Sequence, residues 1–236
     1  MPDGSSYDVA LTVFNPEGRL LQLEYANRVI DRAYPTVGLK YRGGSLLTAV
    51  KRVDSKLMDV DKLHKIYKVS DDLFFAYAGM SSDARVILER LRENYEAYVL
   101  TYGESPSLLE VAKRISDFIP LYTLFAAIRP FGVASLLAGV GKEGDDLILV
   151  LPSGIYSVYK AIALGMNSSG MNKVLEERYK EDLELEDAIR LSIDVVRNGV
   201  DPSKVSVDTL EIAYVNRNER KGYLLSKGEI SKFLSS

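Results

Sequence analysis

Cysteine is absent from this chain of 236 residues, and histidine occurs once, at His64. Without cysteine the chain can form no disulfide, no thiol nucleophile and no thiolate metal site. A metal site would need carboxylates alone, and a Ser-His-Asp triad would have to pass through His64. We therefore expect no metal, no cofactor and no catalytic residues.

The features that mark nucleic-acid or membrane partners are also missing. The 30 Lys and Arg side chains face 33 Asp and Glu, so no basic surplus is available to neutralise phosphates. No apolar run approaches the roughly 20 residues that cross a bilayer. The polar segment from Met1 to Ser6 lacks the basic and apolar regions of a signal peptide. We expect a cytoplasmic protein without a nucleic-acid or membrane partner.

The hydrophobic content of 47% and the charged content of 27% are ordinary for a globular protein with a buried core. Leu20, Leu23 and Ile30 share one face of a predicted helix over 19–32, and Gly43-Gly44 indicates a hairpin turn. Further helices are expected at about 82–101, from Pro106 towards Phe125, and at 168–181, 185–199 and 227–234. Strands are expected at 36–41, 45–50, 64–69, 73–78, 132–140, 146–151, 155–163, 209–215 and 221–225.

Local signals refine two of these helices. Ser81, Ser82 or Asp83 is expected to cap the helix over 82–101, and Pro120 should kink or break the next one. Strands and helices arrive in blocks rather than in βαβ alternation. That order predicts antiparallel sheets covered by paired helices, a layered α+β domain.

The candidate chemical residues all have a simpler structural interpretation. His64 stands beside a strand start, where a surface or structural histidine is the favoured interpretation. Asp71-Asp72 and Asp145-Asp146 are typical of turns between strands. Tyr95, Tyr98 and Tyr102 follow helical spacing and are expected to pack. From the residues alone, no constellation demands an enzyme.

Several motifs in order become specific where single residues do not. They are Tyr7-Asp8, Thr12-Val13-Phe14-Asn15-Pro16-Glu17-Gly18-Arg19-Leu20, Gln22-Leu23-Glu24-Tyr25-Ala26, Gly79-Met80-Ser81-Ser82-Asp83-Ala84-Arg85, Arg129-Pro130-Phe131-Gly132-Val133, Pro152-Ser153-Gly154, Tyr159-Lys160-Ala161 and Ala163-Leu164-Gly165. Together they resemble the α-type subunits of the 20S proteasome, especially the archaeal ones, over about residues 6–234.

The resemblance implies the fold of N-terminal nucleophile hydrolases, a four-layer α/β/β/α sandwich with an extra N-terminal helix. Residues 1–236 would form one domain, with 1–18 as a gate tail and 19–32 as the α-type helix. Seven α-type subunits would form an outer ring stacked on β-type subunits that carry the proteolytic sites. The outer ring would form the pore and gate for unfolded protein substrates and dock the tails of an ATPase activator.

The same resemblance implies that the chain is not itself catalytic. The β-type relatives use an N-terminal threonine whose α-amine helps to move the proton. Tyr34 stands at that position here, and Thr36 matches a later threonine with an ordinary peptide nitrogen. Val50 replaces the supporting carboxylate. Lys65 matches the active-site lysine, but the other catalytic parts are missing.

The implied gate residues, which set the N-terminal tails open or closed, are Tyr7, Asp8, Pro16 and Tyr25. Pro16 would fix a reverse turn there. The family usually has arginine at the position of Val9 and often at that of Asn27. Without the first arginine, the closed gate is expected to be less ordered or to be held differently. Ordinary packing where the helix begins is the alternative for these residues.

The implied activator-docking residues are Lys65, Ala33 and Met80. Lys65 would pair with the terminal carboxylate of an activator tail, and an exposed lysine without a role is the alternative. Ala33 replaces a family glycine. Alanine needs more room and disfavours a positive φ, which puts docking in doubt.

Two other functions stay open at this point. A divergent α-type homologue could assemble without β-type subunits. An N-terminal nucleophile hydrolase could instead arise by cleavage before an internal serine or threonine.

Overall fold

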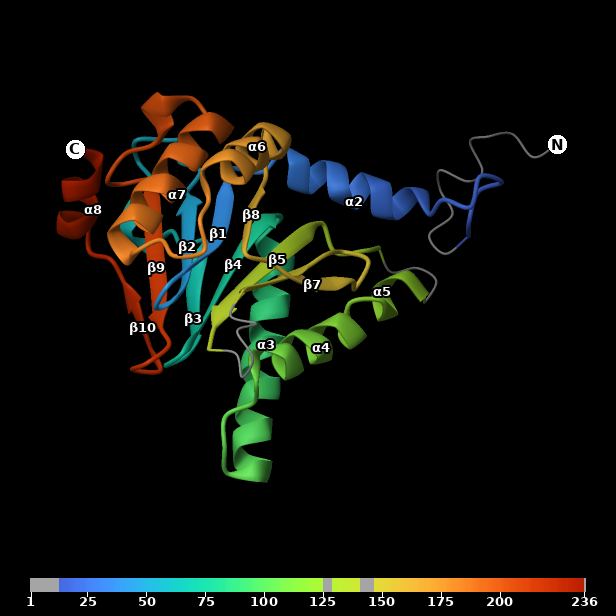
Figure 1. The fold of residues 1–236 in the computed structure, drawn as a ribbon. Coiled ribbons are helices and arrows are strands. Elements are labelled where there is room, and N and C mark those ends of the chain that lie inside the picture. Colours follow the sequence, from blue (N-terminus) through green and yellow to red (C-terminus); the bar gives the residue numbers. More distant parts are fainter. Residues whose placement is uncertain (1–12, 125–128, 141–146, 236) are drawn as a thin grey trace.

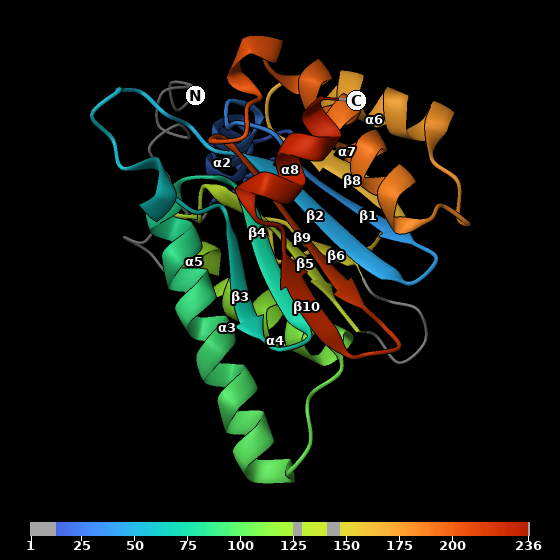
Figure 2. The same ribbon diagram turned by 90° about the vertical axis from the view of Figure 1, so that its left-hand side faces the viewer.

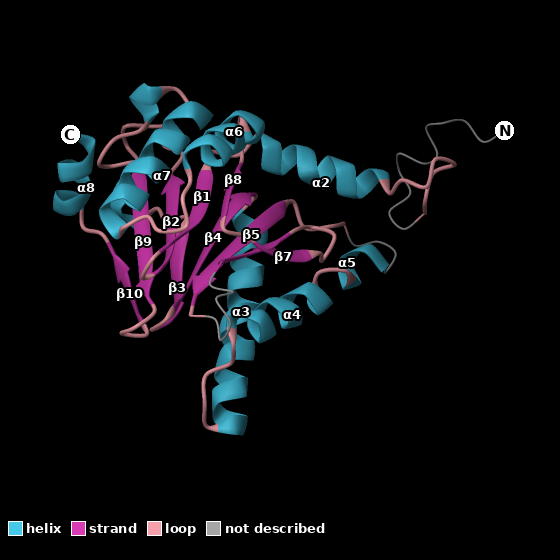
Figure 3. Cartoon of the chain, viewed as in Figure 1, coloured by secondary structure: helices cyan, strands magenta, loops and turns pink. Residues whose placement is uncertain are grey.

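The computed structural model describes residues 13–124, 129–140 and 147–235. Two five-stranded antiparallel sheets lie face to face, and helices cover the outer face of each sheet (Figures 1 and 3). This arrangement is the four-layer α/β/β/α sandwich expected from the sequence.

The first sheet has the order β10-β9-β2-β1-β8. Its strands are β1 (Thr36–Tyr41), β2 (Gly44–Val50), β8 (Ala161–Leu164), β9 (Leu210–Asn216) and β10 (Lys221–Leu224). The helices that pack on it are α6 (Ser168–Arg178), α7 (Leu185–Gly199) and α8 (Lys227–Leu234). A short 3-10 helix, Pro202–Lys204, precedes β9.

The second sheet has the order β3-β4-β5-β6-β7. Its strands are β3 (Ile66–Ser70), β4 (Leu73–Gly79), β5 (Val133–Gly139), β6 (Leu147–Val150) and β7 (Tyr156–Val158). It is covered by α3 (Ser81–Tyr102) and α4 (Leu108–Phe118), with the short α5 (Leu121–Leu124) following. A 3-10 helix, Val60–Lys62, precedes β3.

The central strands are apolar on both faces because helices cover one face of each sheet and the other sheet covers the opposite face. In β9, Leu210 and Ile212 pack towards α7, whereas Ala213 and Val215 pack between the two sheets. This alternation is the period of two that a strand imposes on its side chains. It gives three apolar layers, one between the sheets and one beneath each pair of helices.

Helix α2 (Leu21–Asp31) extends away from the sandwich (Figure 1), and Ile30 near its end joins the apolar layer between the sheets. Ala26 and Ile30 are its buried residues, and it contacts β4 and β5. Its apolar stripe is therefore only partly covered in the single chain.

Three details differ from the sequence-based expectation. The run 155–163 is not one strand: β7 belongs to the second sheet and β8 to the first, so the chain changes sheets between them. Helix α3 is preceded by Met80, which has no capping side-chain bond, rather than by a capping Ser or Asp. Helix α6 ends at Arg178, three residues before the expected end. The break at Pro120 is confirmed, since α4 and α5 are separate helices around it.

Candidate functional site

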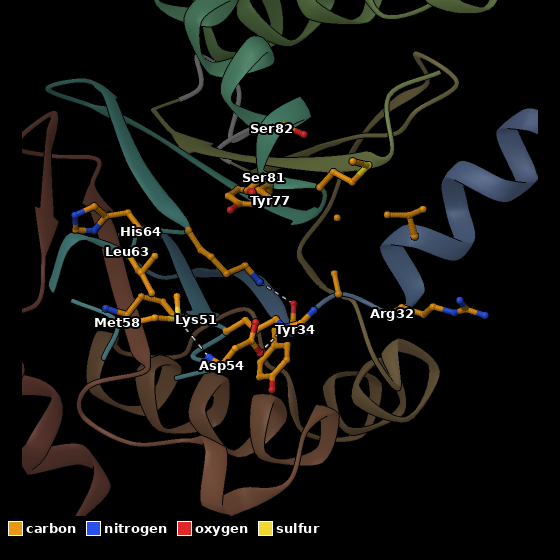
Figure 4. Close-up of a pocket in the computed structure, with 16 residues that line it drawn as sticks. Arg32, Tyr34, Lys51, Asp54, Met58, Leu63, His64, Tyr77, Ser81 and Ser82 are labelled. Atoms are coloured by element: carbon orange, nitrogen blue, oxygen red, sulfur yellow. Dashed lines mark hydrogen bonds and ion pairs between the residues drawn. The ribbon is translucent and has the colours of Figure 1, made fainter. Parts of the chain in front are cut away.

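A pocket of about 590 Å³ lies where α2, the ends of both sheets and the start of α3 meet. Figure 4 shows the side chains around it, with His64 and Met58 on one side and Arg32, the residue after α2, on the opposite side. The three expected docking residues, Ala33, Lys65 and Met80, all line this one pocket, although they lie in three different connecting segments, before β1, before β3 and before α3. The structure thus brings together residues that lie up to 47 positions apart in the sequence.

Lys65 is buried, with 8% of its surface exposed, so the alternative of an exposed lysine is wrong. Its amine donates a hydrogen bond to the Tyr34 carbonyl at 2.7 Å and lies 5.8 Å from the centre of the Tyr77 ring. Burial lowers the pKa of Lys65 to about 7, against an opposing effect of the Glu211 charge. The amine therefore changes charge near neutral pH.

Glu211 of β9 is a part of the site that the sequence reasoning missed. Its side chain is only 8% exposed, and it accepts hydrogen bonds from the backbone N–H groups of Lys65 and Ile66 at 2.6 and 3.1 Å. Its other oxygen lies 2.7 Å from His64 Nδ1. His64 thus has a structural partner, as expected. A signal for it exists in the alternation of side chains along β9, because Glu211 lies on the same inward face as Ala213 and Val215.

The backbone around Ala33 is tightly packed but not strained. The Ala33 carbonyl accepts from the Met166 N–H at 2.8 Å, and a Cβ added at Gly165, where φ is +98°, would lie 2.6 Å from the Ala33 oxygen. Ala33 itself does not have a positive φ. The expected conflict between alanine and a left-handed backbone is therefore absent, and what remains is the space that one methyl group takes in the pocket.

An ion pair next to the pocket joins two of the sequence motifs. The Asp83 carboxylate accepts two bonds from the Arg129 guanidinium, at 2.6 and 2.7 Å, and a third from the Gly132 N–H at 2.8 Å. Burial opposes ionisation of Asp83, but these donors outweigh it and hold the pKa of Asp83 below its ordinary value. The Met80 N–H donates to the Gly132 carbonyl at 2.9 Å, so the start of α3 is held at the pocket edge.

Thr36 and Val50, which the sequence comparison with β-type relatives singled out, both have ordinary structural roles. The Thr36 hydroxyl is fully buried and donates to the Tyr77 carbonyl at 2.7 Å. Val50 is also fully buried, in the apolar layer beneath α7. Within the described ranges, no group of three or more His, Cys, Asp and Glu side chains is placed to hold a metal ion.

The expected gate residues lie outside the pocket or outside the described residues. Tyr7 and Asp8 fall in the undescribed N-terminal segment, as does Val9. Pro16 occupies the second position of a turn that the Gly18 N–H closes on the Asn15 carbonyl at 2.9 Å. Tyr25 is partly exposed on α2, with the Arg28 guanidinium 5.5 Å from its ring centre. Their gating role stays a prediction.

A membrane-spanning role has no candidate helix among the residues that are described, because none of their helices is both long and apolar enough.

Proteins of known family are similar to this chain over its whole length. A family model described as "Proteasome subunit" matches residues 30–215, and a second model, which describes the N-terminal signature of proteasome A subunits, matches residues 7–28. Several proteins named as alpha subunits of the proteasome are similar throughout. The one from Thermococcus gammatolerans is 36% identical, covering 100% of this chain and 89% of the relative. The one from Pyrococcus horikoshii is 37% identical with the same coverage. The one from Archaeoglobus fulgidus is 37% identical over 97% of this chain and 92% of the relative. On these matches and the four-layer fold, the chain belongs to the α-type subunits of the proteasome core, a family that assembles with other proteasome subunits in a ring.

Proposed function

We propose that this chain is a non-catalytic subunit of the outer ring of a 20S proteasome, and that its pocket docks the C-terminal tails of an ATPase activator. One observation carries the docking proposal: Ala33, Lys65 and Met80 line a single pocket in which a lysine amine is buried. A buried cation can bind a carboxylate strongly because little water competes for it.

The charges around the pocket support an anionic ligand. Among the described lining residues, the Arg, Lys, His, Asp and Glu side chains are Arg32, Lys51, Arg52, Asp54, His64 and Lys65. Asp54 accepts from Arg52 at 2.8 Å, and the Lys51 amine donates to the Val60 carbonyl at 2.9 Å. The single carboxylate is therefore already paired, and the excess of positive charge favours a ligand that ends in a carboxylate.

Gate and ring roles rest on the N-terminal part of the chain. Residues 1–18 would form the gate tail of a single domain that spans residues 1–236. The turn at Pro16 is closed by its own backbone bond, so it can set the direction of the tail. Val13 and Phe14 are 52% and 66% exposed, and Tyr25 and Val29 of α2 are also exposed. Apolar side chains left in water on a projecting segment favour contact with neighbouring subunits.

Docking can be tested with a synthetic peptide copied from the C-terminus of an ATPase activator. Assembled rings should bind the peptide with a free carboxylate, and the amidated peptide about 10-fold or more weakly. Lys65→Met should weaken binding of the free-acid peptide by a similar factor, measured by fluorescence anisotropy at pH 6.5.

Lys113→Met is the matched control, since Lys113 is exposed on α4 and pairs with Asp117 away from the pocket. It should bind both peptides as the wild type does. Equal binding of the two peptides, or binding that survives Lys65→Met, would remove docking from the proposed function and leave the ring role intact.

A further inference from the structure

One buried carboxylate holds three consecutive residues, the first two of which line the pocket. Glu211 Oε2 accepts from the backbone N–H groups of Lys65 and Ile66, at 2.6 and 3.1 Å, and Oε1 lies 2.7 Å from Nδ1 of His64. Glu211 comes from β9 in the first sheet, whereas Ile66 begins β3 in the second. The contact therefore fixes the backbone of Lys65 across the gap between the sheets.

The far end of the Lys65 side chain is fixed separately. Its amine donates to the Tyr34 carbonyl at 2.7 Å and lies 3.4 Å from the Pro35 carbonyl oxygen. Both carbonyls belong to the segment just before β1, so the amine points towards that segment. Both carbonyls are neutral. Glu211 is the one carboxylate among the causes that act on the pKa of Lys65.

The electrostatic balance at the amine follows from the groups around it. Burial lowers the pKa of Lys65 to about 7, and the charge of Glu211 raises it. Tyr77 from β4 lies beneath the amine, and burial raises the pKa of Tyr77 to about 12, so that ring stays neutral. The other titratable groups that face the pocket are Arg32 at the end of α2, Tyr34 before β1, Lys51, Arg52 and Asp54 after β2, and His64 before β3. Among them, the Asp54 carboxylate accepts a hydrogen bond from Arg52 at 2.8 Å.

We propose that Glu211 is a positioning residue of the pocket, which holds Lys65 in place and increases the protonated fraction of its amine near neutral pH, where an anionic ligand would bind it. The ligand part of this inference rests on the proposed docking function. Because the amine titrates near neutrality, the pocket loses its buried positive charge as the pH rises through about 7. Carboxylate binding should fall about 10-fold per pH unit above that point.

The test uses assembled full-length protein with ¹³C-labelled lysine. The Lys65 ¹³Cε resonance is assigned by its loss in Lys65→Met. Its chemical shift is then followed as a function of pH, and the pH at the midpoint of the change gives the pKa of the amine. The wild type should titrate near 7. Glu211→Gln, which removes the charge at nearly constant shape, should titrate about one pH unit lower.

Asp208→Asn is the matched control. Asp208 lies three residues before Glu211 but is exposed, and it pairs with Lys227 at 2.7 Å. It should leave the Lys65 midpoint unchanged because water screens its charge. If Glu211→Gln fails to assemble, Glu211→Asp replaces it in the test. The aspartate side chain is one methylene shorter, so its charge lies farther from Lys65 and the midpoint should fall. A midpoint equal to that of the wild type would overturn the proposal.

The activator peptide separates this inference from the docking proposal. With docking intact, the pH at which peptide binding is lost should move down in Glu211→Gln together with the Lys65 midpoint. If the peptide binds at no pH but the midpoint still shifts, docking is wrong and the positioning role of Glu211 stands. If Glu211→Gln and the wild type share one midpoint, the positioning role is wrong whatever the peptide does.

Discussion

Two carboxylates at the edge of the pocket, those of Asp83 and Glu211, are both buried and have similar sets of hydrogen-bond donors. Each accepts backbone N–H bonds from a segment far away in the chain: Gly132 for Asp83, and Lys65 with Ile66 for Glu211. Each also binds a basic side chain, Arg129 or His64. A buried carboxylate is stable only with several donors, so losing it leaves backbone groups unpaired as well. These residues therefore fix pocket geometry rather than touch a ligand.

For Asp83 this argument predicts a measurable loss of stability. Asp83→Asn should lower the free energy of unfolding at pH 7 by about 2 kcal/mol, because the Arg129 and Gly132 donors lose a charged acceptor. The folded pKa of Asp83 lies below its ordinary value of 3.8. The unfolded state therefore binds more protons, so the contribution is present above pH 3.8 and is lost as the pH falls below it. Urea denaturation at pH 7 and pH 3 should give a large and then a smaller difference from the wild type.

Asp117→Asn supplies the comparison for that measurement. Asp117 is an exposed carboxylate on α4 whose partner, Lys113, is 3.5 Å away. Such surface pairs contribute little, so this variant should unfold like the wild type at both pH values. An Asp83→Asn protein as stable as Asp117→Asn would show that the ion pair with Arg129 does not hold the start of α3.

At the residue scale, the sequence predicted which residues gather around the pocket better than the surroundings of each one. The motif containing Asp83 and the one containing Arg129 were both recognised, yet their pairing depends on tertiary contact and has no local signal. Lys65 was identified, but its burial was not, because burial depends on the segment before β1 packing over its amine. Glu211 does have a signal in the sequence, because the alternation of β9 puts it on the same face as Ala213 and Val215.

Helix α3 is an element whose two halves have different surroundings. It has 22 residues, about 33 Å at 1.5 Å per residue, and continues past the strand ends of the sheet it covers (Figure 2). Its buried residues, from Asp83 to Leu91, all lie in the first half. Leu100 near its end is 87% exposed. Tertiary packing therefore stabilises the first half of α3 most, whereas its last turn depends more on helix propensity and the Gly103 C-cap.

This difference predicts unequal effects of the same substitution along one helix. Leu91→Ala should lower the free energy of unfolding by about 2–5 kcal/mol, since Leu91 is fully buried in the layer between α3 and the second sheet. Leu100→Ala should change it by less than about 0.5 kcal/mol. Urea denaturation of both variants gives the comparison. Equal losses would mean that the projecting end of α3 is packed in solution, contrary to its exposure.

Elements were predicted well where one local pattern governs them. The helix at 227–234 has the predicted bounds because Ser226 and Glu229 form a capping box. The run 155–163 was misassigned because propensity stays high throughout, while the chain changes sheets at Tyr159 and Lys160. The Tyr159 N–H still pairs with Leu147 of the second sheet, and the Lys160 carbonyl with Lys40 of the first. Only the packing of the two sheets decides that switch.

At the scale of the whole molecule, the family fold is kept, and the position expected for a nucleophile lies inside the chain. Helix α2 precedes β1, so Tyr34, which the resemblance places at that position, has chain on both sides. The nearby Thr36 has its hydroxyl bonded to the Tyr77 carbonyl and its nitrogen in a peptide bond. An N-terminal nucleophile needs a free α-amine, and none exists at this position without cleavage.

The chain purified alone should therefore keep its full mass of 26.3 kDa and hydrolyse no fluorogenic peptide. Co-expressed with a β-type proteasome subunit, it should appear by native mass spectrometry in a larger ring assembly that does hydrolyse peptide. Thr36→Val should leave that activity unchanged, because the β-type chain supplies the nucleophile. A shortened chain that begins at Thr36 would instead support a hydrolase activated by cleavage. Rings that never include the β-type subunit would support an α-type homologue that assembles alone, so the same two measurements separate all three functions.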